Sequence, residues 1–165
     1  MYMQALEFLE DERDSWRPYE ALAALSDESL ERPTPADSPA HGWSGRDLIS
    51  HMIGWREYLL AVARELALNE HSETQRLLDA EWDADGADAV NARLAAPWRA
   101  LPMAEVRQRF GSVPGELRGY LTVVPETRWI KNADVQRTFI ETTLEHDEAH
   151  RADLDAILAA AAEPA

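Results

Sequence analysis

Two histidines stand four positions apart near the end of the chain, in the stretch TLEHDEAHRADL that covers residues 143–154. In a helix, His146 and His150 would lie about 6 Å apart along the axis, and both imidazoles could converge on one ion. This spacing recurs in helical zinc sites. By itself the pair is more often two surface histidines, or a buried pair with other hydrogen-bonding partners, than a metal site. A third ligand is needed before the pair predicts a metal site.

Helical periodicity turns both histidines toward the interior. One face of the last helix, about 80° wide, holds a series in which they replace core residues: Phe139, Thr143, His146, His150, Leu154 and Ile157. The acidic residues of the same stretch fall on the opposite, solvated face: Glu141, Glu145, Glu148 and Asp155. Asp147 and Asp153 fall at the margins of the inward face, where either a supporting role or simple exposure is expected.

A third histidine, His51, lies on the apolar stripe of another expected helix. The stretch WSGRDLISHMIGW, residues 43–55, starts that helix with Ser44 as N-cap and Asp47 three residues later. Its inward stripe reads Leu48, His51, Trp55, Tyr58, Leu59, Val62 and Leu66. Three neutral imidazoles would hold a divalent cation and leave a coordination position open, as catalytic sites do. The other two histidines, His41 and His71, are expected to be exposed.

Four long helices are expected to position these side chains. They cover about residues 3–25, 44–66, 103–124 and 135–161, and the first should bury one stripe: Leu6, Leu9, Trp16 and Ala23. A polar, proline-rich loop is expected over residues 26–43 and two short helices around a turn at Asp85 and Gly86. No strand-like alternation is present. The sequence therefore predicts one all-α domain over residues 1–165, a four-helix bundle with extra short helices between its second and third long helices.

Composition narrows the classes of partner and of chemistry. The formal net charge is −15, from 31 acidic and 16 basic residues, which argues against nucleic acid and anionic membrane surfaces as partners. The chain has no cysteine, so a metal must be held by nitrogen and oxygen, and any thiol must come from another molecule. The acidic amino-terminal stretch has no basic region of a secretory signal, so a cytoplasmic protein is expected.

The two histidine-bearing stretches, residues 43–55 and 143–154, resemble those of the DinB/YfiT-like superfamily of metalloenzymes. This superfamily includes the amino-terminal domain of mycothiol-dependent maleylpyruvate isomerase. The resemblance implies a four-helix bundle in which His51, His146 and His150 bind one divalent metal, zinc or nickel. It further implies a homodimer, and activities that include thiol-dependent S-transferases and isomerases using mycothiol or bacillithiol.

Three functions follow as hypotheses. The leading one is a divalent-metal-dependent enzyme, a thiol-dependent S-transferase acting on a small electrophilic substrate. The second keeps the metal but makes its bound water the nucleophile of a hydrolase, with a carboxylate of Asp47, Asp147 or Glu148 as base. The third is a non-catalytic bundle that binds a metal or ligand, as stress or self-resistance proteins do. In each case the aromatic residues Trp16, Trp55 and Tyr58 could line a pocket or belong to the core.

Overall fold

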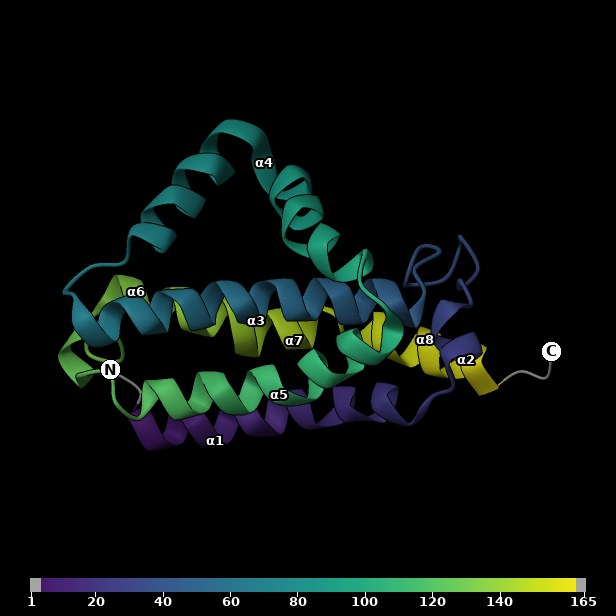
Figure 1. Cartoon of the computed structure of the whole chain (residues 1–165), viewed down its shortest axis with the longest axis horizontal. Helices are drawn as coiled ribbons and strands as arrows, with labels where there is room; N and C mark the ends of the chain where they lie inside the picture. The colour runs from purple at the N-terminus through teal and green to yellow at the C-terminus, as the bar shows by residue number, and fades with distance from the viewer. Residues whose placement is uncertain (1–3, 163–165) are drawn as a thin grey trace.

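The computed structural model describes residues 4–162, and within that range every regular element is a helix (Figure 1). The elements in chain order are α1 (Ala5–Trp16), the 3₁₀ helix η1 (Arg17–Ala24), α2 (Asp27–Glu31), α3 (Gly45–Leu68), α4 (Glu73–Arg99), α5 (Met103–Leu121), the 3₁₀ helix η2 (Glu126–Arg128), α6 (Ala133–Ile140), the π-helical segment η3 (Glu141–Glu145), α7 (His146–Ala149) and α8 (Arg151–Ala162). The predicted all-α class is confirmed. No helix of this range is both long and apolar enough to cross a membrane.

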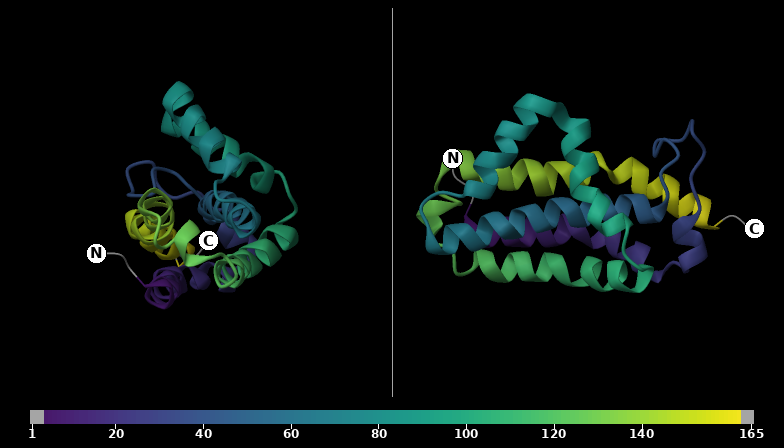
Figure 2. Two further views of the ribbon diagram at one scale, coloured as in Figure 1. Left: turned by 90° about the vertical axis from the view of Figure 1, so that its left-hand side faces the viewer. Right: turned by 45° about the horizontal axis from the view of Figure 1, so that its top comes forward.

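Rows of helix run along the long axis of the molecule. They are α1 with η1, α3, α5, and the row formed by α6, η3, α7 and α8 (Figures 1 and 2). In the end-on view of Figure 2 these rows surround a common interior, and α4 projects away from them as an arch above α3. The last row and α3 carry the three inward histidines, so the arrangement of the rows decides whether those residues meet.

Helix α3 begins as its sequence predicts. The Ser44 hydroxyl accepts a hydrogen bond from the Asp47 backbone N–H at 3.2 Å, and the Asp47 carboxylate accepts one from the Ser44 N–H at 2.9 Å. This reciprocal capping box satisfies backbone donors that a helix start leaves free. Most side chains of α3 are buried around its whole circumference. The helix is therefore the central row rather than a surface helix with one apolar stripe.

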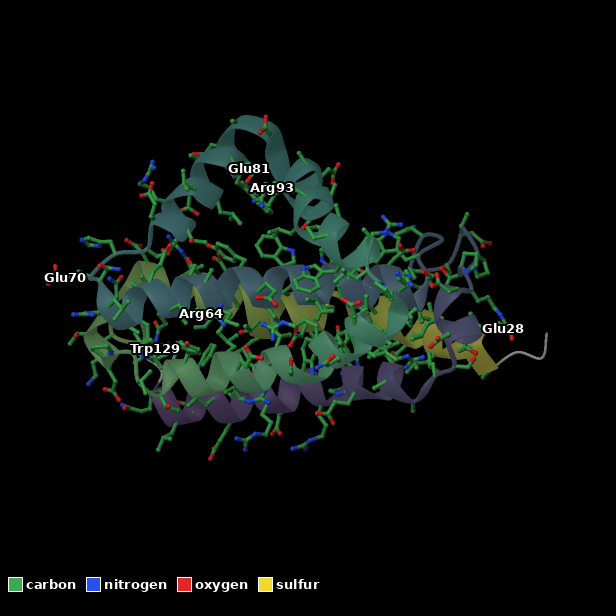
Figure 3. All side chains as sticks on the ribbon, in the orientation of Figure 1. Glu28, Arg64, Glu70, Glu81, Arg93 and Trp129 are labelled. Atoms are coloured by element: carbon green, nitrogen blue, oxygen red, sulfur yellow. The ribbon has the colours of Figure 1, made fainter. Side chains whose placement is uncertain are left out.

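Helix α4 has two arms joined at Gly86, whose φ of 81° and ψ of 172° are not helical. The predicted pair of helices around Asp85 and Gly86 is thus confirmed. The returning arm packs against α3 at Gly54, where an added Cβ would come within 2.6 Å of the Leu94 carbonyl oxygen. Inside the arch, Arg93 donates two hydrogen bonds of 2.5 Å to Glu81 on the opposite arm (Figure 3). These contacts hold the two arms together and hold the arch on α3.

The first helix differs from its prediction. Helix α1 ends at Trp16 and continues as a 3₁₀ helix, and Leu6, expected in the core, is 75% exposed. Ala23 is exposed as well. The face that is actually buried contains Phe8, Glu12, Trp16, Tyr19 and Leu22. Trp16 is buried as predicted, but the predictions for Leu6 and Ala23 were wrong because a buried acidic residue interrupts the apolar pattern of this face; residue 3, the expected start, lies outside the described residues.

Two hydrophobic clusters form the core, and a polar layer separates them. On α3 the first cluster ends at Ile53 and the second begins at Trp55. The polar residues His51 and Arg56 lie close to this boundary, one on each side of it. On the last row the clusters include Phe139 and Leu154, and the residues between them include both histidines. The candidate site therefore occupies the middle of the molecule's long axis, where packing on both sides restrains its side chains.

Candidate metal centre

The three predicted histidines meet in this polar layer. The Nε2 atom of His51 lies 2.9 Å from Nε2 of His146 and 3.0 Å from Nε2 of His150. One nitrogen of each residue lies within 4.8 Å of the others, which is close enough to hold one metal ion. His51 is 4% exposed, and the other two are half-buried. We call these three residues the histidine cluster.

The distances suit a divalent cation with nitrogen ligands. Zinc binds histidine nitrogen at about 2.0–2.1 Å, so two nitrogens on one tetrahedral zinc lie about 3.3 Å apart. The observed separations are slightly shorter, and small side-chain rotations would bridge the difference. A single proton on His51 Nε2 would have to be shared between two acceptors, whereas one cation would accept all three lone pairs directly. The residues present therefore fit a metal ion.

Electrostatics keeps two of these imidazoles neutral. Burial lowers the pKa of His51 to about 3, with a further contribution from nearby His150. Burial also lowers the pKa of His146 to about 2, and His51, His150 and Arg56 add to the effect. A neutral imidazole is the form that binds a metal, because its unprotonated nitrogen carries the lone pair. Both imidazoles are therefore in the form that could bind a metal at neutral pH.

The orientation of His150 is set by its neighbours. Its Nδ1 lies 2.6 Å from a carboxylate oxygen of Asp153, which fixes the Nδ1–H tautomer and leaves Nε2 free for the cluster. The Trp43 ring stacks on the imidazole with centroids 5.8 Å apart. His150 itself lies at the break between α7 and α8, where its φ of −90° and ψ of 7° depart from α-helical values. Asp153, left open at the sequence level, supports the cluster.

A π-helical segment leads directly into the histidine cluster. Residues Glu141–Glu145 form η3, and His146 follows. The Thr142 carbonyl accepts a hydrogen bond of 3.1 Å from Arg56, and the Thr143 hydroxyl donates one of 2.6 Å to the Phe139 carbonyl. Short π segments recur at functional sites because they change the direction in which side chains leave a helix. The sequence pattern did not predict this π-helical segment, because one α-helical period was assumed for the whole of the last helix.

A second polar group, which we call the arginine cluster, lies beside the histidines. It contains Arg56, Glu12 and Asp147, all fully or almost fully buried, and Arg118. Arg56 pairs with Glu12 at 3.3 Å and with Asp147 at 2.7 Å, and Arg118 reaches the other oxygen of Glu12 at 2.7 Å. The Trp16 ring lies 4.8 Å from the Arg56 guanidinium carbon. This cluster ties α1, α3, α5 and α7 together.

The arginine cluster was not predicted from the sequence, although a signal was present. Glu12 lies midway between Phe8 and Trp16 at helical spacing, and Arg56 lies four residues after Met52. A charge within an apolar stripe is the pattern that predicted inward histidines, and it applies equally to these charged residues. Charged side chains are almost never fully buried without a partner, so two such positions on two helices predict a pair.

The carboxylates considered as general bases are all engaged or remote. Burial raises the pKa of Asp147, while Arg56 and a 2.8 Å hydrogen bond from Ser15 act in the opposite direction. Asp47 caps α3 and pairs with Arg99 at 2.5 Å. Glu148 is exposed, as are the three other acidic residues expected on the solvated face of the last row. These acidic-face predictions are confirmed, and so is the exposure of His41 and His71.

Two cavities give access to the histidine cluster. One, of about 420 Å³, reaches His146 and has Trp55 and Tyr58 in its wall, under the first arm of α4. The other, of about 280 Å³, reaches His51 and is lined by Trp43, Asp47, Asp88, Asn91, Ala92, Ala95 and Arg99. Trp16 lines neither and belongs to the core. The cluster can therefore be approached by a small molecule from the side of either histidine.

The chain matches no protein-family model, no curated protein and no solved structure. The site is accordingly defined by its residues and their geometry.

Proposed function

We propose that this protein is a divalent-metal-dependent enzyme with the DinB/YfiT-like four-helix bundle fold, and that His51, His146 and His150 bind its metal. The observation that carries the proposal is the meeting of three Nε2 atoms, two of them on imidazoles held neutral by burial, beside a cavity lined by aromatic side chains. Three protein ligands leave a position for substrate or cofactor, as in catalytic rather than structural sites. Zinc and nickel, which we propose, are among the metals that imidazole ligands suit.

The reaction that we propose is transfer of a low-molecular-weight thiol, of the mycothiol or bacillithiol kind, to a small electrophile. A divalent cation in this site would bind the thiol sulfur and lower its pKa. The protein's residues hold the three nitrogens in place, with Asp153 fixing the His150 tautomer and Trp43 stacked on its ring. The chain has no cysteine, so the nucleophilic sulfur has to be brought by the cofactor.

A metal-dependent hydrolase is the second candidate, because the carboxylates that could act as its general base are mostly paired or exposed to solvent. Such a reaction requires a base within hydrogen-bond reach of the attacking water. Asp147 is committed to Arg56, and Glu148 faces solvent. Asp47 lines the cavity of His51, and it is the residue that keeps this alternative open. We further propose that the enzyme is a homodimer located in the cytoplasm. The simplest alternative function is that of a non-catalytic bundle that binds a metal.

A two-stage experiment tests the proposal. The purified protein is first reconstituted with zinc or nickel and its metal content is measured; we expect about one equivalent per chain, and much less for His146→Ala. A model electrophile such as monochlorobimane is then supplied with mycothiol, bacillithiol or glutathione in turn. Metal-dependent consumption that requires one of these thiols supports the transferase. Metal-dependent turnover without any thiol would establish the hydrolase instead, and a metal-bound protein inert toward both reaction types would favour the non-catalytic bundle.

A further inference from the structure

The cavity beside His146 has an aromatic wall built around Trp55. Its indole lies 5.7 Å from the Tyr58 ring, 6.1 Å from the Trp82 ring and 5.8 Å from the His146 imidazole, measured between centroids. The Trp55 indole N–H donates a 2.9 Å hydrogen bond to Asn91, which fixes the ring. Trp82 comes from the first arm of α4 and is 42% exposed, so it forms the outer edge of the wall. Such rings present electron-rich faces that attract cations.

The charged side chains that line this cavity are acidic. Asp79 and Glu141 line it, and no lysine or arginine is found among its lining residues within the described part of the chain. A neighbouring hollow shares Asp79 and Glu141 and adds Asp83 and Asp134 together with one base, Arg137, which lies 3.5 Å from Asp134 and 3.9 Å from Glu141. An anionic ligand would meet repulsion at this entrance, whereas a cation would be attracted.

A buried hydroxyl group of the same cavity lacks a partner. Tyr58 is 5% exposed, lines the cavity, and its hydroxyl makes no hydrogen bond with any described residue. An unpaired buried polar group costs about 1–3 kcal/mol, so such groups usually meet a ligand or an ordered water. Burial, with smaller contributions from Asp79 and Glu65, raises the pKa of Tyr58, and the hydroxyl stays protonated at neutral pH. Its oxygen is therefore an acceptor without a partner on a residue that lines this cavity.

We propose that this cavity recognises an organic ammonium group, held against Trp55 and Trp82 and close to the carboxylates of Asp79 and Glu141, with the Tyr58 oxygen as an acceptor. The substrate of the enzyme is then an amine-bearing small molecule whose reactive part lies toward His146. The role of this molecule as substrate rests on the proposed function, whereas its binding does not. The binding can thus be tested on protein with or without metal.

Isothermal titration calorimetry with three probes of similar size tests the proposal: benzylamine, benzyl alcohol and benzoate, which are cationic, neutral and anionic at pH 7. The full chain is titrated both metal-free and loaded with zinc. We expect benzylamine to bind at least about tenfold more tightly than benzyl alcohol, in line with a cation–π contact plus a carboxylate, and benzoate to bind most weakly. Equal affinities for all three probes, or a preference for benzoate, would overturn the proposal even if the metal-loaded protein were an active transferase.

Surface-accessible variants locate the site without threatening the fold. Glu141 and Glu145 are both exposed and lie on the same π segment, but only Glu141 lines the cavity. We expect Glu141→Gln and Trp82→Ala each to weaken benzylamine binding about fivefold, which is the effect of losing one such contact. Glu145→Gln should bind benzylamine as tightly as the wild-type protein does. Tyr58→Phe should weaken benzylamine more than benzyl alcohol relative to wild type. If Glu141→Gln and Glu145→Gln reduced the affinity equally, the preference would come from net charge and the assigned cavity would be refuted.

Discussion

The histidine cluster and the arginine cluster lie side by side, but their buried polar side chains are compensated in different ways. Their residues on α3, His51 and Arg56, are five positions apart, and on the last row His146 and Asp147 are consecutive. In the arginine cluster a cation lies between two carboxylates, so the charges are paired within the protein. In the histidine cluster three groups of one kind turn their nitrogens toward one another.

The difference teaches that burial of polar side chains does not by itself indicate function. Both clusters lie in the interior, although two of the histidines are only half-buried, and both join α3 to the last row. The two clusters differ in whether their groups are complementary. The opposite charges of the arginine cluster neutralise each other, whereas the converging nitrogen lone pairs of the histidine cluster require an electrophile from outside the protein. We therefore propose a structural role for the arginine cluster and a metal-binding role for the histidine cluster. This assignment makes opposite predictions for stability and for metal affinity.

The largest expected effect is on stability, from Arg56→Met. The change would leave Glu12 and Asp147 buried without their shared cation. Breaking a buried ion pair in this way costs about 3–5 kcal/mol of the free energy of unfolding. Urea denaturation followed by circular dichroism measures it.

The matched control is Arg64→Met on the same helix, since Arg64 is about half exposed and lies 3.6 Å from Glu116. An exposed pair contributes at most about 1 kcal/mol. Equal losses in the two variants would show that the arginine cluster has no special structural role.

The next effect is on metal binding, from His146→Ala. Zinc at about 100 times its dissociation constant should stabilise the wild-type protein by about 2.7 kcal/mol, which is the linkage expected for a ligand that binds only the folded state. The variant should lose most of this stabilisation while remaining folded in the absence of metal. Thermal denaturation with and without zinc provides the comparison, and His71→Ala, at an exposed position, is the control. Retention of the full zinc effect in His146→Ala would remove this residue from the ligand set.

A smaller effect is expected from Asp153→Asn, which weakens the acceptor of the His150 Nδ1–H group. Changes to such supporting groups typically lower metal affinity about 10–100-fold. Competition with a chromophoric chelator measures the affinity, and the unfolding free energy without metal should change little. Asp155→Asn, two positions further on the exposed face, carries the same charge change and should behave as wild type. Were both variants to lose affinity equally, general charge rather than the hydrogen bond would be responsible.

The smallest effect is a dependence of stability on pH in the metal-free protein. Because burial lowers the folded-state pKa of His51 to about 3 and of His146 to about 2, the unfolded chain takes up protons first as the pH falls through about 6.5. Stability is thus nearly unaffected well above that pH and declines as the pH falls, by about 1.4 kcal/mol between pH 7 and pH 6 for the two histidines together. Urea denaturation at each pH measures the decline. In His146→Ala the slope should be roughly halved, and an unchanged slope would mean that other groups cause it.

Much of the local structure was determined by the sequence itself. The capping box at Ser44, the turn at Gly86 and the inward positions of His51, His146 and His150 were all predicted and are all present. These features depend on interactions within a few residues, namely backbone hydrogen bonds, φ preferences and the period of one helix. Side-chain direction around a helix follows directly from that period.

Only the tertiary structure decided what these side chains meet. The 2.9 Å approach of His51 to His146 joins residues 95 positions apart, and the partners of Arg56 come from α1 and α7. The π segment and the buried face of α1 depend on the same long-range contacts. A helix specifies which way a residue points through its own hydrogen bonds, but the distance to another helix is set by the packing of both clusters of the core. The sequence thus indicated three candidate ligands, and packing brought them to one point.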